Sequence, residues 1–176
     1  MKRKDIKNKI KEYFLTNPSE QLRVRQIERE IKVPLPSAIR YTKELVDEKI
    51  LKINRIANIK VYSVDRTSSS YVFHKKLFNL KSIFESNLIL FLIQELSNPN
   101  IVLFGSYAKG EDLETSDIDL YIETPSKKKI NVQKFEKLLQ REIQLFTYKN
   151  IKEVKNKELA NNIVNGVTLN GFVEVY

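Results

Sequence analysis

The sequence contains no cysteine, and its first 104 residues contain no glycine. Without cysteine the chain can form neither a disulfide framework nor a cysteine-based zinc site, and this composition is typical of a reducing compartment. The longest nearly apolar run, Leu88–Ile93, is far shorter than the roughly 20 residues that a membrane-spanning helix needs. The polar start, Met1–Asp5, lacks the apolar segment of a signal peptide. We therefore expect a cytoplasmic protein that has no membrane partner.

The four glycines all lie in the last 72 residues, at positions 105, 110, 166 and 171. In a chain that uses glycine so sparingly, each one predicts a backbone constraint, such as a tight turn or the close approach of a ligand.

The positive charge is also unevenly distributed. Residues 1–66 contain 17 basic and 9 acidic residues, a net charge of +8, whereas residues 67–176 contain 14 and 13, a net charge of +1. This asymmetry favours a first module that meets a polyanion and a second module with a different task. A merely solubilising surface is the alternative interpretation.

The first 66 residues have the pattern of three helices followed by a β-hairpin. Helical spacing of apolar residues predicts helices over 5–16, 24–31 and 36–49, and Pro36 suits the first position of the third helix. Residues 50–53 and 60–64 are predicted to form two strands around a turn near Ala57 and Asn58.

This order, with a helix ending in Leu-x-x-Glu-x-Ile and a basic hairpin, resembles a winged helix-turn-helix. The resemblance covers about residues 1–65 and implies that the third helix enters the major groove of double-stranded DNA while the hairpin reaches phosphates. The residues that would contact DNA are Ser37, Arg40, Lys43, Arg55 and Lys60. Winged helices also serve as protein–protein adaptors, and this alternative stays open.

A polar linker, residues 66–70, is followed by a predicted helical connector over residues 71–97. Its apolar positions, which include Phe73, Leu77, Phe84 and Leu88, form a stripe that is either part of a core or the seam of a homodimer.

The second module begins with a buried strand, residues 101–104, which stops at Gly105-Ser106. Ser116-Asp117-Ile118-Asp119-Leu120 follows after a polar stretch. Its alternating pattern predicts a strand with both aspartates on one face, about 7 Å apart. Two carboxylates this close need a compensating cation, and Mg²⁺ prefers such oxygen ligands. The glycine and the Ser106 hydroxyl are suited to phosphate oxygens, so the equipment is that of metal-assisted nucleotidyl transfer.

These two motifs resemble the signature of the minimal nucleotidyltransferases of the DNA polymerase β-like superfamily. The resemblance spans about residues 85–176. It implies that Asp117 and Asp119 are catalytic metal ligands and that Gly105 and Ser106 bind the phosphates of a nucleoside triphosphate (NTP).

One position departs from the family pattern. Active members usually carry a third carboxylate on a later strand, here residues 142–146, and the register predicts Gln144 at that place. An amide oxygen can bind a metal but cannot act as a base. Glu142 lies on the same strand face, about 6.6 Å away, and is the candidate substitute among the catalytic residues.

The sequence therefore predicts an α+β protein. An N-terminal winged helix-turn-helix domain, residues 1–66, precedes a helical connector and a mixed-sheet nucleotidyltransferase domain, residues 71–176. The expected activity is Mg²⁺-dependent transfer of a nucleoside monophosphate (NMP) to an acceptor, such as a protein side chain, a nucleic-acid end or a small hydroxyl compound. The alternative is a non-catalytic DNA-binding regulator or antitoxin-like protein in which the transferase fold is degenerate.

Overall fold

A computed structural model describes residues 3–175 and divides the chain into two units, Met1–Phe78 and Asn79–Tyr176. The division falls inside one helix, α4 (Ser69–Glu85), so residues that the sequence assigns to a connector belong partly to each unit. No helix of the described chain is both long and apolar enough to cross a membrane.

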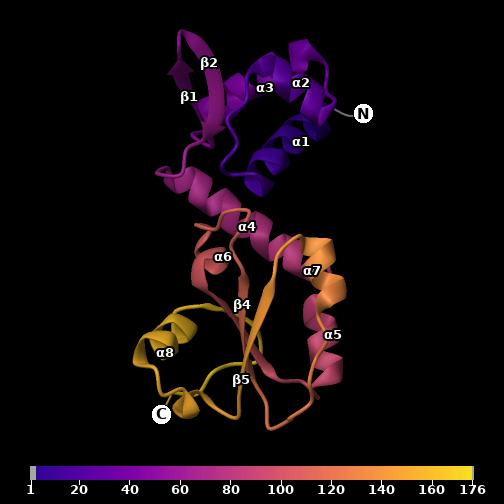
Figure 1. The fold of residues 1–176 in the computed structure, drawn as a ribbon, viewed down its shortest axis with the longest axis vertical. Helices are drawn as coiled ribbons and strands as arrows, with labels where there is room; N and C mark the ends of the chain where they lie inside the picture. Colours follow the sequence, from indigo (N-terminus) through magenta and orange to yellow (C-terminus); the bar gives the residue numbers. More distant parts are fainter. Residues whose placement is uncertain (1–2, 176) are drawn as a thin grey trace. The chain divides into compact units, whose positions relative to one another are not determined.

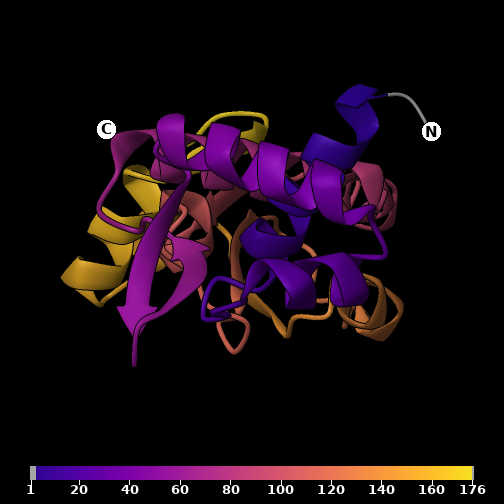
Figure 2. The ribbon, with the colours of Figure 1, turned by 90° about the horizontal axis from the view of Figure 1, so that it is seen from above.

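The first unit has the predicted order of three helices and a hairpin (Figure 2). Its elements are α1 (Arg3–Thr16), α2 (Val24–Ile31), α3 (Leu35–Asp47), β1 (Leu51–Ile56) and β2 (Ile59–Val64). The hairpin turn at Ala57 and Asn58 has φ values of 46° and 62°, as a two-residue turn matched to the strand twist requires. A bridge between Leu22 and Tyr62 adds a short third partner to the hairpin.

The core of the first unit explains why the start of α4 belongs to it. Tyr71 is buried together with Phe14, Leu45 and other apolar residues of the three helices. Lys75 is only 1% exposed, and its Nζ donates to the Leu15 carbonyl at 2.7 Å, close to the end of α1. This contact satisfies one of the carbonyls that a helix end leaves without a partner. The first core therefore extends beyond the boundary at residue 66 that the sequence predicts.

The second unit is built on a four-stranded mixed sheet in the order β5-β4-β3-β6. The two inner strands, β3 (Asn100–Phe104) and β4 (Ile118–Glu123), are antiparallel, and β4 pairs with β5 (Ile143–Tyr148) in parallel. The edge strand β6 (Val167–Asn170) follows α8 (Lys157–Val164), as expected for a helix that stops at Gly166.

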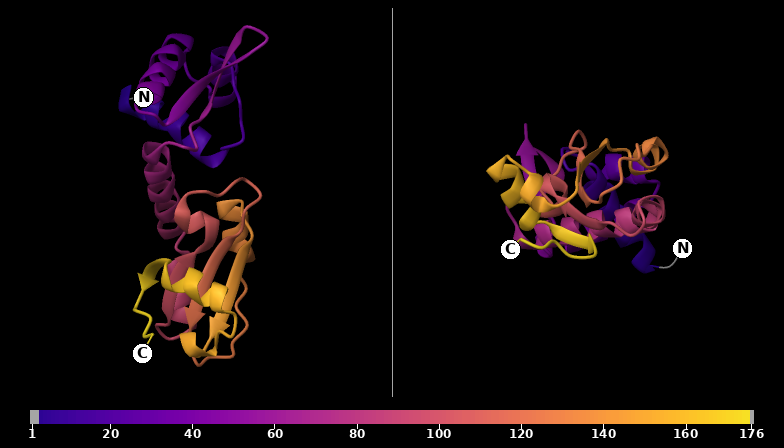
Figure 3. Two further views of the ribbon diagram at one scale, coloured as in Figure 1. Left: turned by 90° about the vertical axis from the view of Figure 1, so that its left-hand side faces the viewer. Right: turned by 90° about the horizontal axis from the view of Figure 1, so that it is seen from below.

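Helices cover both faces of this sheet (Figures 1 and 3). The helices α5 (Leu88–Glu95) and α7 (Gln133–Leu139) lie over one face, where the core includes Leu92, Leu120 and Phe135. The opposite face packs Val102, Tyr121 and Ile163 beneath α8 and the short 3₁₀ helix Ile151–Glu153. Since strand residues alternate, Asp117 and Asp119 share the second face with Tyr121.

The predicted apolar stripe is split between core and solvent. Leu88 and Leu92 are buried, whereas Phe73, Leu77 and Phe84 on α4 are 58%, 49% and 51% exposed.

Candidate active site

Gly105 ends β3 and begins α6 (Gly105–Lys109) with a φ of +75°. A Cβ atom at this position would lie only 2.2 Å from Oδ2 of Asp119. The glycine is thus required twice, by its left-handed backbone and by the carboxylate that occupies the space of a side chain. The structure brings the two predicted motifs into contact at this point.

Register explains the contact. Asp119 lies opposite Phe104 on β3 and opposite Gln144 on β5, so the last residue of β3 brings Gly105 beside the aspartate. Asp117 comes directly before β4 and is half-buried, as are Asp119 and Ser106. Phe104, the register partner of Asp119, forms an edge-to-face pair with Phe146, with ring centroids 5.2 Å apart.

The electrostatics of the pair follow from burial and repulsion. Burial raises the pKa of the Asp119 carboxyl, and the neighbouring Asp117 raises it further. Both effects disfavour the ionised form, and a bound cation would offset them because it favours the charged carboxylates. The ionised pair is therefore unfavourable without a cation, and a divalent cation would lower its free energy.

Gln144 lies at the position that the sequence predicts for it. It is paired with Asp119 in the parallel register, and its Nε2 donates a hydrogen bond to Oδ2 of Asp117. An ionised carboxylate at this position could not donate this hydrogen bond. The amide occupies one acceptor site of the Asp117 carboxylate and adds no charge.

Glu142 stays outside this arrangement. It is exposed and precedes β5, and its backbone carbonyl accepts from the Ile118 N–H at 2.8 Å. Among the described residues, no group of three or more acidic, histidine or cysteine side chains could hold a metal. The carboxylates gathered at the sheet are Asp117 and Asp119, and the Gln144 amide lies beside them with its Nε2 toward Asp117.

This donor set fits a single Mg²⁺ ion. Magnesium commonly uses one or two carboxylates and completes its shell with waters and substrate phosphates. Two carboxylate groups, one with a raised pKa, and an amide oxygen available by rotation of the Gln144 side chain satisfy that pattern.

Comparison with known proteins agrees with this geometry. Residues 85–168 match the family model for the nucleotidyltransferase domain. The match begins at the end of α4, includes both motifs, and reaches into β6. It supports placing this segment in the nucleotidyltransferase superfamily. No curated protein and no solved structure matches the chain.

The second unit contains a polar network that the motifs do not predict. Asn79 of α4 is 1% exposed, and its Nδ2 donates to the Tyr107 carbonyl of α6 at 2.9 Å and to Oδ1 of Asp112 at 2.7 Å. Asp112 is equally buried. This network fixes the loop between the two motifs to the helix that follows Gly105. An asparagine within an apolar helical stripe was the available signal.

A pocket of about 570 Å³ opens next to Asp117 in the second unit. Its lining includes the loop residues Glu114 and Ser116, and Lys137, Arg141 and Glu142 from α7 and the segment that follows it. The pocket has both cations and carboxylates next to the metal-binding candidates, so it has the charges to orient a phosphorylated or hydroxyl-bearing substrate. The two cations escaped the motif analysis because they lie on another helix and its following turn.

The residues predicted to contact DNA occupy two surfaces of the first unit. Ser37, Arg40 and Lys43 lie on α3, while Arg55 and Lys60 face each other as partners in the hairpin register.

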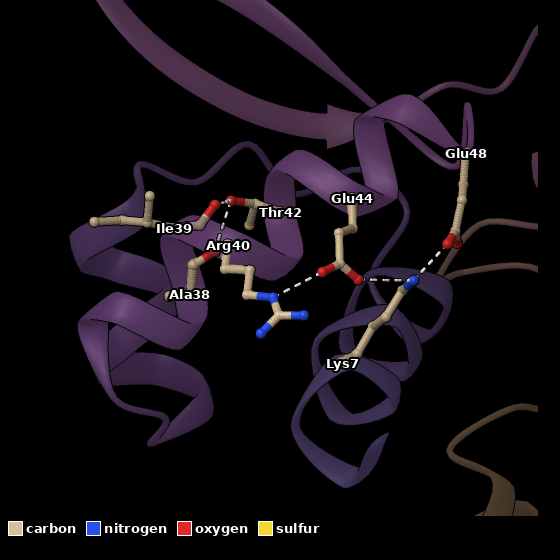
Figure 4. Close-up of polar contacts among 7 residues, drawn as sticks. All are labelled: Lys7, Ala38, Ile39, Arg40, Thr42, Glu44 and Glu48. Atoms are coloured by element: carbon tan, nitrogen blue, oxygen red, sulfur yellow. Dashed lines mark hydrogen bonds and ion pairs between the residues drawn. The ribbon is translucent and has the colours of Figure 1, made fainter. Parts of the chain in front are cut away.

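The cations of α3 are not all available. Figure 4 shows Arg40 bound to Glu44, with Nε and Oε1 at 2.9 Å, and Glu44 bound in turn to Lys7 of α1 at 3.1 Å. Lys7 also pairs with Glu48. Hydrogen bonds from Arg40 and then Lys7 hold the pKa of the Glu44 carboxyl below its usual value. The surface of α3 is therefore a mixed network of both charges.

Proposed function

We propose that this protein is a nucleotidyltransferase that moves an NMP group from a magnesium–NTP complex to an acceptor hydroxyl. The observation that carries the proposal is the contact between Gly105 and Asp119, which brings the turn that we assign to phosphate binding against a carboxylate whose pKa is raised.

Each residue has a distinct part in this proposal. Asp117 and Asp119 would hold Mg²⁺, with the Gln144 amide oxygen as an additional donor. The Ser106 hydroxyl and the backbone N–H groups at the start of α6 would donate to the phosphates. When bound, the ion neutralises developing charge on the phosphate oxygens.

In the proposed transfer reaction, one bond forms at the α-phosphorus and one breaks. The acceptor oxygen forms a bond to the α-phosphorus, the bond from that phosphorus to the bridging oxygen of the β-phosphate breaks, and pyrophosphate leaves. The acceptor proton needs a base, and Gln144 cannot supply one. Glu142 is the carboxylate on the adjacent pocket wall that we assign to this task, with a protein side chain, a nucleic-acid end or a small hydroxyl compound as acceptor.

A second candidate function rests on Gln144 itself. The amide occupies the third position and donates to Asp117, so the site can hold nucleotide without activating an acceptor. In that case the domain is a degenerate sensor in a DNA-binding regulator or antitoxin-like protein.

We also propose that the first unit is a winged helix-turn-helix that binds double-stranded DNA. The support is its element order and the net charge of +8 over residues 1–66. Binding should weaken steeply with salt, because phosphate contacts release condensed counterions. Affinity of the full chain for duplex DNA that is constant from low to physiological salt would contradict this.

One experiment separates the two functions of the second unit. The protein is incubated with α-labelled NTPs, Mg²⁺ and cell extract, in parallel with a melting assay with and without Mg–NTP. Label transferred to a macromolecule or to a small compound of the extract, and lost in Glu142→Gln, supports the enzyme. A rise in melting temperature without labelling supports the sensor, since a ligand stabilises the folded state by mass action. Neither effect with any nucleotide would contradict both.

A further inference from the structure

A groove of about 930 Å³ lies between α2 and the β-hairpin, wholly within the first unit. Four of its lining residues are basic, namely Arg23, Arg25, Arg29 and Lys60, and none of its lining residues is acidic. Two exposed isoleucines of the hairpin, Ile56 and Ile59, complete it.

The fold assembles this surface through one short backbone pairing. The Leu22 N–H donates to the Tyr62 carbonyl at 3.0 Å, and the Tyr62 N–H donates to the Leu22 carbonyl at 2.8 Å. Arg23 follows immediately, so the start of α2 is held beside β2, which carries Lys60.

The remaining two cations follow from helical spacing. Arg25 and Arg29 are four residues apart on α2 and therefore share one face, while the other face buries Ile27 and Ile31 in the core. All four cationic side chains are exposed.

These cations differ from Arg40 of α3 in their partners. Within the described part of the chain, the side chains of Arg23, Arg25, Arg29 and Lys60 form no ion pair. Arg40, in contrast, is paired with Glu44, which also binds Lys7 of α1. Four like charges around one groove repel one another, so their free energy falls when a polyanion binds between them.

The types of residue that line the groove indicate the chemical class of its ligand. The chain has 23 lysines and only eight arginines, yet three of those arginines fall within residues 23–29. Arginine holds phosphate through two parallel N–H donors, which lysine cannot do. Exposed isoleucines beside such cations suit the apolar surface of sugars.

We propose that this groove, rather than the outer face of α3, carries the main contacts to the sugar–phosphate backbone of duplex DNA. The proposal rests on the DNA-binding function proposed for the first unit and assigns it to a different surface. Because backbone contacts dominate affinity and carry no sequence information, binding through the groove tolerates many sequences.

The test compares two double variants of the full chain with equal loss of charge. Arg25→Gln with Arg29→Gln removes two groove cations, and Arg40→Gln with Lys43→Gln removes two α3 cations as the matched control. Binding to a fluorescently labelled duplex is followed by anisotropy over a series of salt concentrations. Both pairs are exposed, so melting curves should stay at the wild-type position.

The groove variant should lose at least about tenfold in affinity and reduce the slope of log Kd against log salt by about two, one for each phosphate contact. The control should change affinity less than threefold. The reverse ranking would overturn the groove while leaving the DNA-binding proposal intact. Absence of wild-type binding to duplex would refute both. Polyglutamate that competes with DNA at equal charge concentration would show an acidic polypeptide site and would also overturn the proposal.

Discussion

Both units place residues other than glycine at positive φ, such as Asn87 and Gln140 in the second unit, but only the second unit also uses glycine there. The first unit contains no glycine and places Lys32, Lys49, Ala57 and Asn58 at φ values of 46° to 62°. The second unit has glycine at 105 and 171, where a Cβ would lie 2.2 Å and 2.0 Å from a side-chain oxygen. Left-handed backbone alone therefore does not demand glycine here. Gly105 and Gly171 lie where another group fills the space of the missing side chain.

The largest expected effect comes from filling that space at the active site. Gly105→Ala should destabilise the fold by about 1–3 kcal/mol, because it strains the backbone and pushes Asp119 away. It should also abolish the rise in melting temperature with Mg–NTP.

Gly171→Ala is the matched control, with φ +68° and an overlap with Oδ1 of Asn100. It should cost stability of similar order but keep the ligand effect. If Gly105→Ala retained full Mg–NTP stabilisation, the contact with Asp119 would have no part in the site.

The second prediction concerns charge. The first unit spreads its cations over exposed surface, whereas the second places two carboxylates together on a half-buried face. Asp117→Asn with Asp119→Asn should abolish Mg–NTP stabilisation and raise the melting temperature of the ligand-free protein, because a desolvated, self-repelling pair is removed.

The raised pKa of Asp119 fixes the direction in which stability changes with pH. The folded protein has a raised Asp119 pKa, so this group stabilises at low pH, and the contribution is lost as pH rises through that pKa. The melting-temperature advantage of Asp119→Asn should therefore grow from about pH 4 to pH 7, a range that starts near the ordinary aspartate pKa. An advantage that shrinks over this range would contradict the cause that we assign.

The third prediction restores the carboxylate that the family pattern expects. Gln144→Glu removes the amide donor to Asp117 and adds a third negative charge. The ligand-free protein should melt lower, and its affinity for Mg²⁺, measured by calorimetry, should rise by about tenfold, which corresponds to 1.4 kcal/mol. Glu142→Gln is the control and should leave Mg²⁺ affinity nearly unchanged, because Glu142 lies outside the carboxylate pair.

The smallest effect lies in the first unit. Ala57 has φ 46° at the hairpin turn, and no glycine occurs in this unit. Ala57→Gly should stabilise the protein by up to about 1 kcal/mol, since a left-handed alanine is strained by about that amount. A loss of stability in chemical denaturation would mean that the entropy of the unfolded glycine outweighs the strain.

The elements that the sequence predicts correctly are those with a strong local period. The alternation of Ile118, Leu120 and Ile122 predicts the strand and the face of Asp119, and the position of Gln144 opposite Asp119 follows from two such strands side by side. Helix spacing likewise predicts α2 over residues 24–31.

What the sequence does not predict depends on contacts between distant residues. Asn79 bonds to Asp112 across 33 positions, and Lys75 reaches Leu15 across 60. Neither contact is signalled by a periodic pattern in the sequence. The ion pair of Arg40 with Glu44 lies within one helix, yet its extension to Lys7 requires the packing of α1. The site roles are predictions that measurements of nucleotide binding and transfer will test. They concern Asp117, Asp119, Gly105, Ser106 and Glu142.

The reactivity of the buried Lys75 amine can report on local opening of the first unit. An acylating reagent can reach Nζ only after the contact with the Leu15 carbonyl opens, whereas the exposed Lys76 is always accessible. The ratio of the two labelling rates, read by mass spectrometry, therefore measures the free energy of local opening at the end of α1. This gives an opening equilibrium for one unit without a probe being introduced.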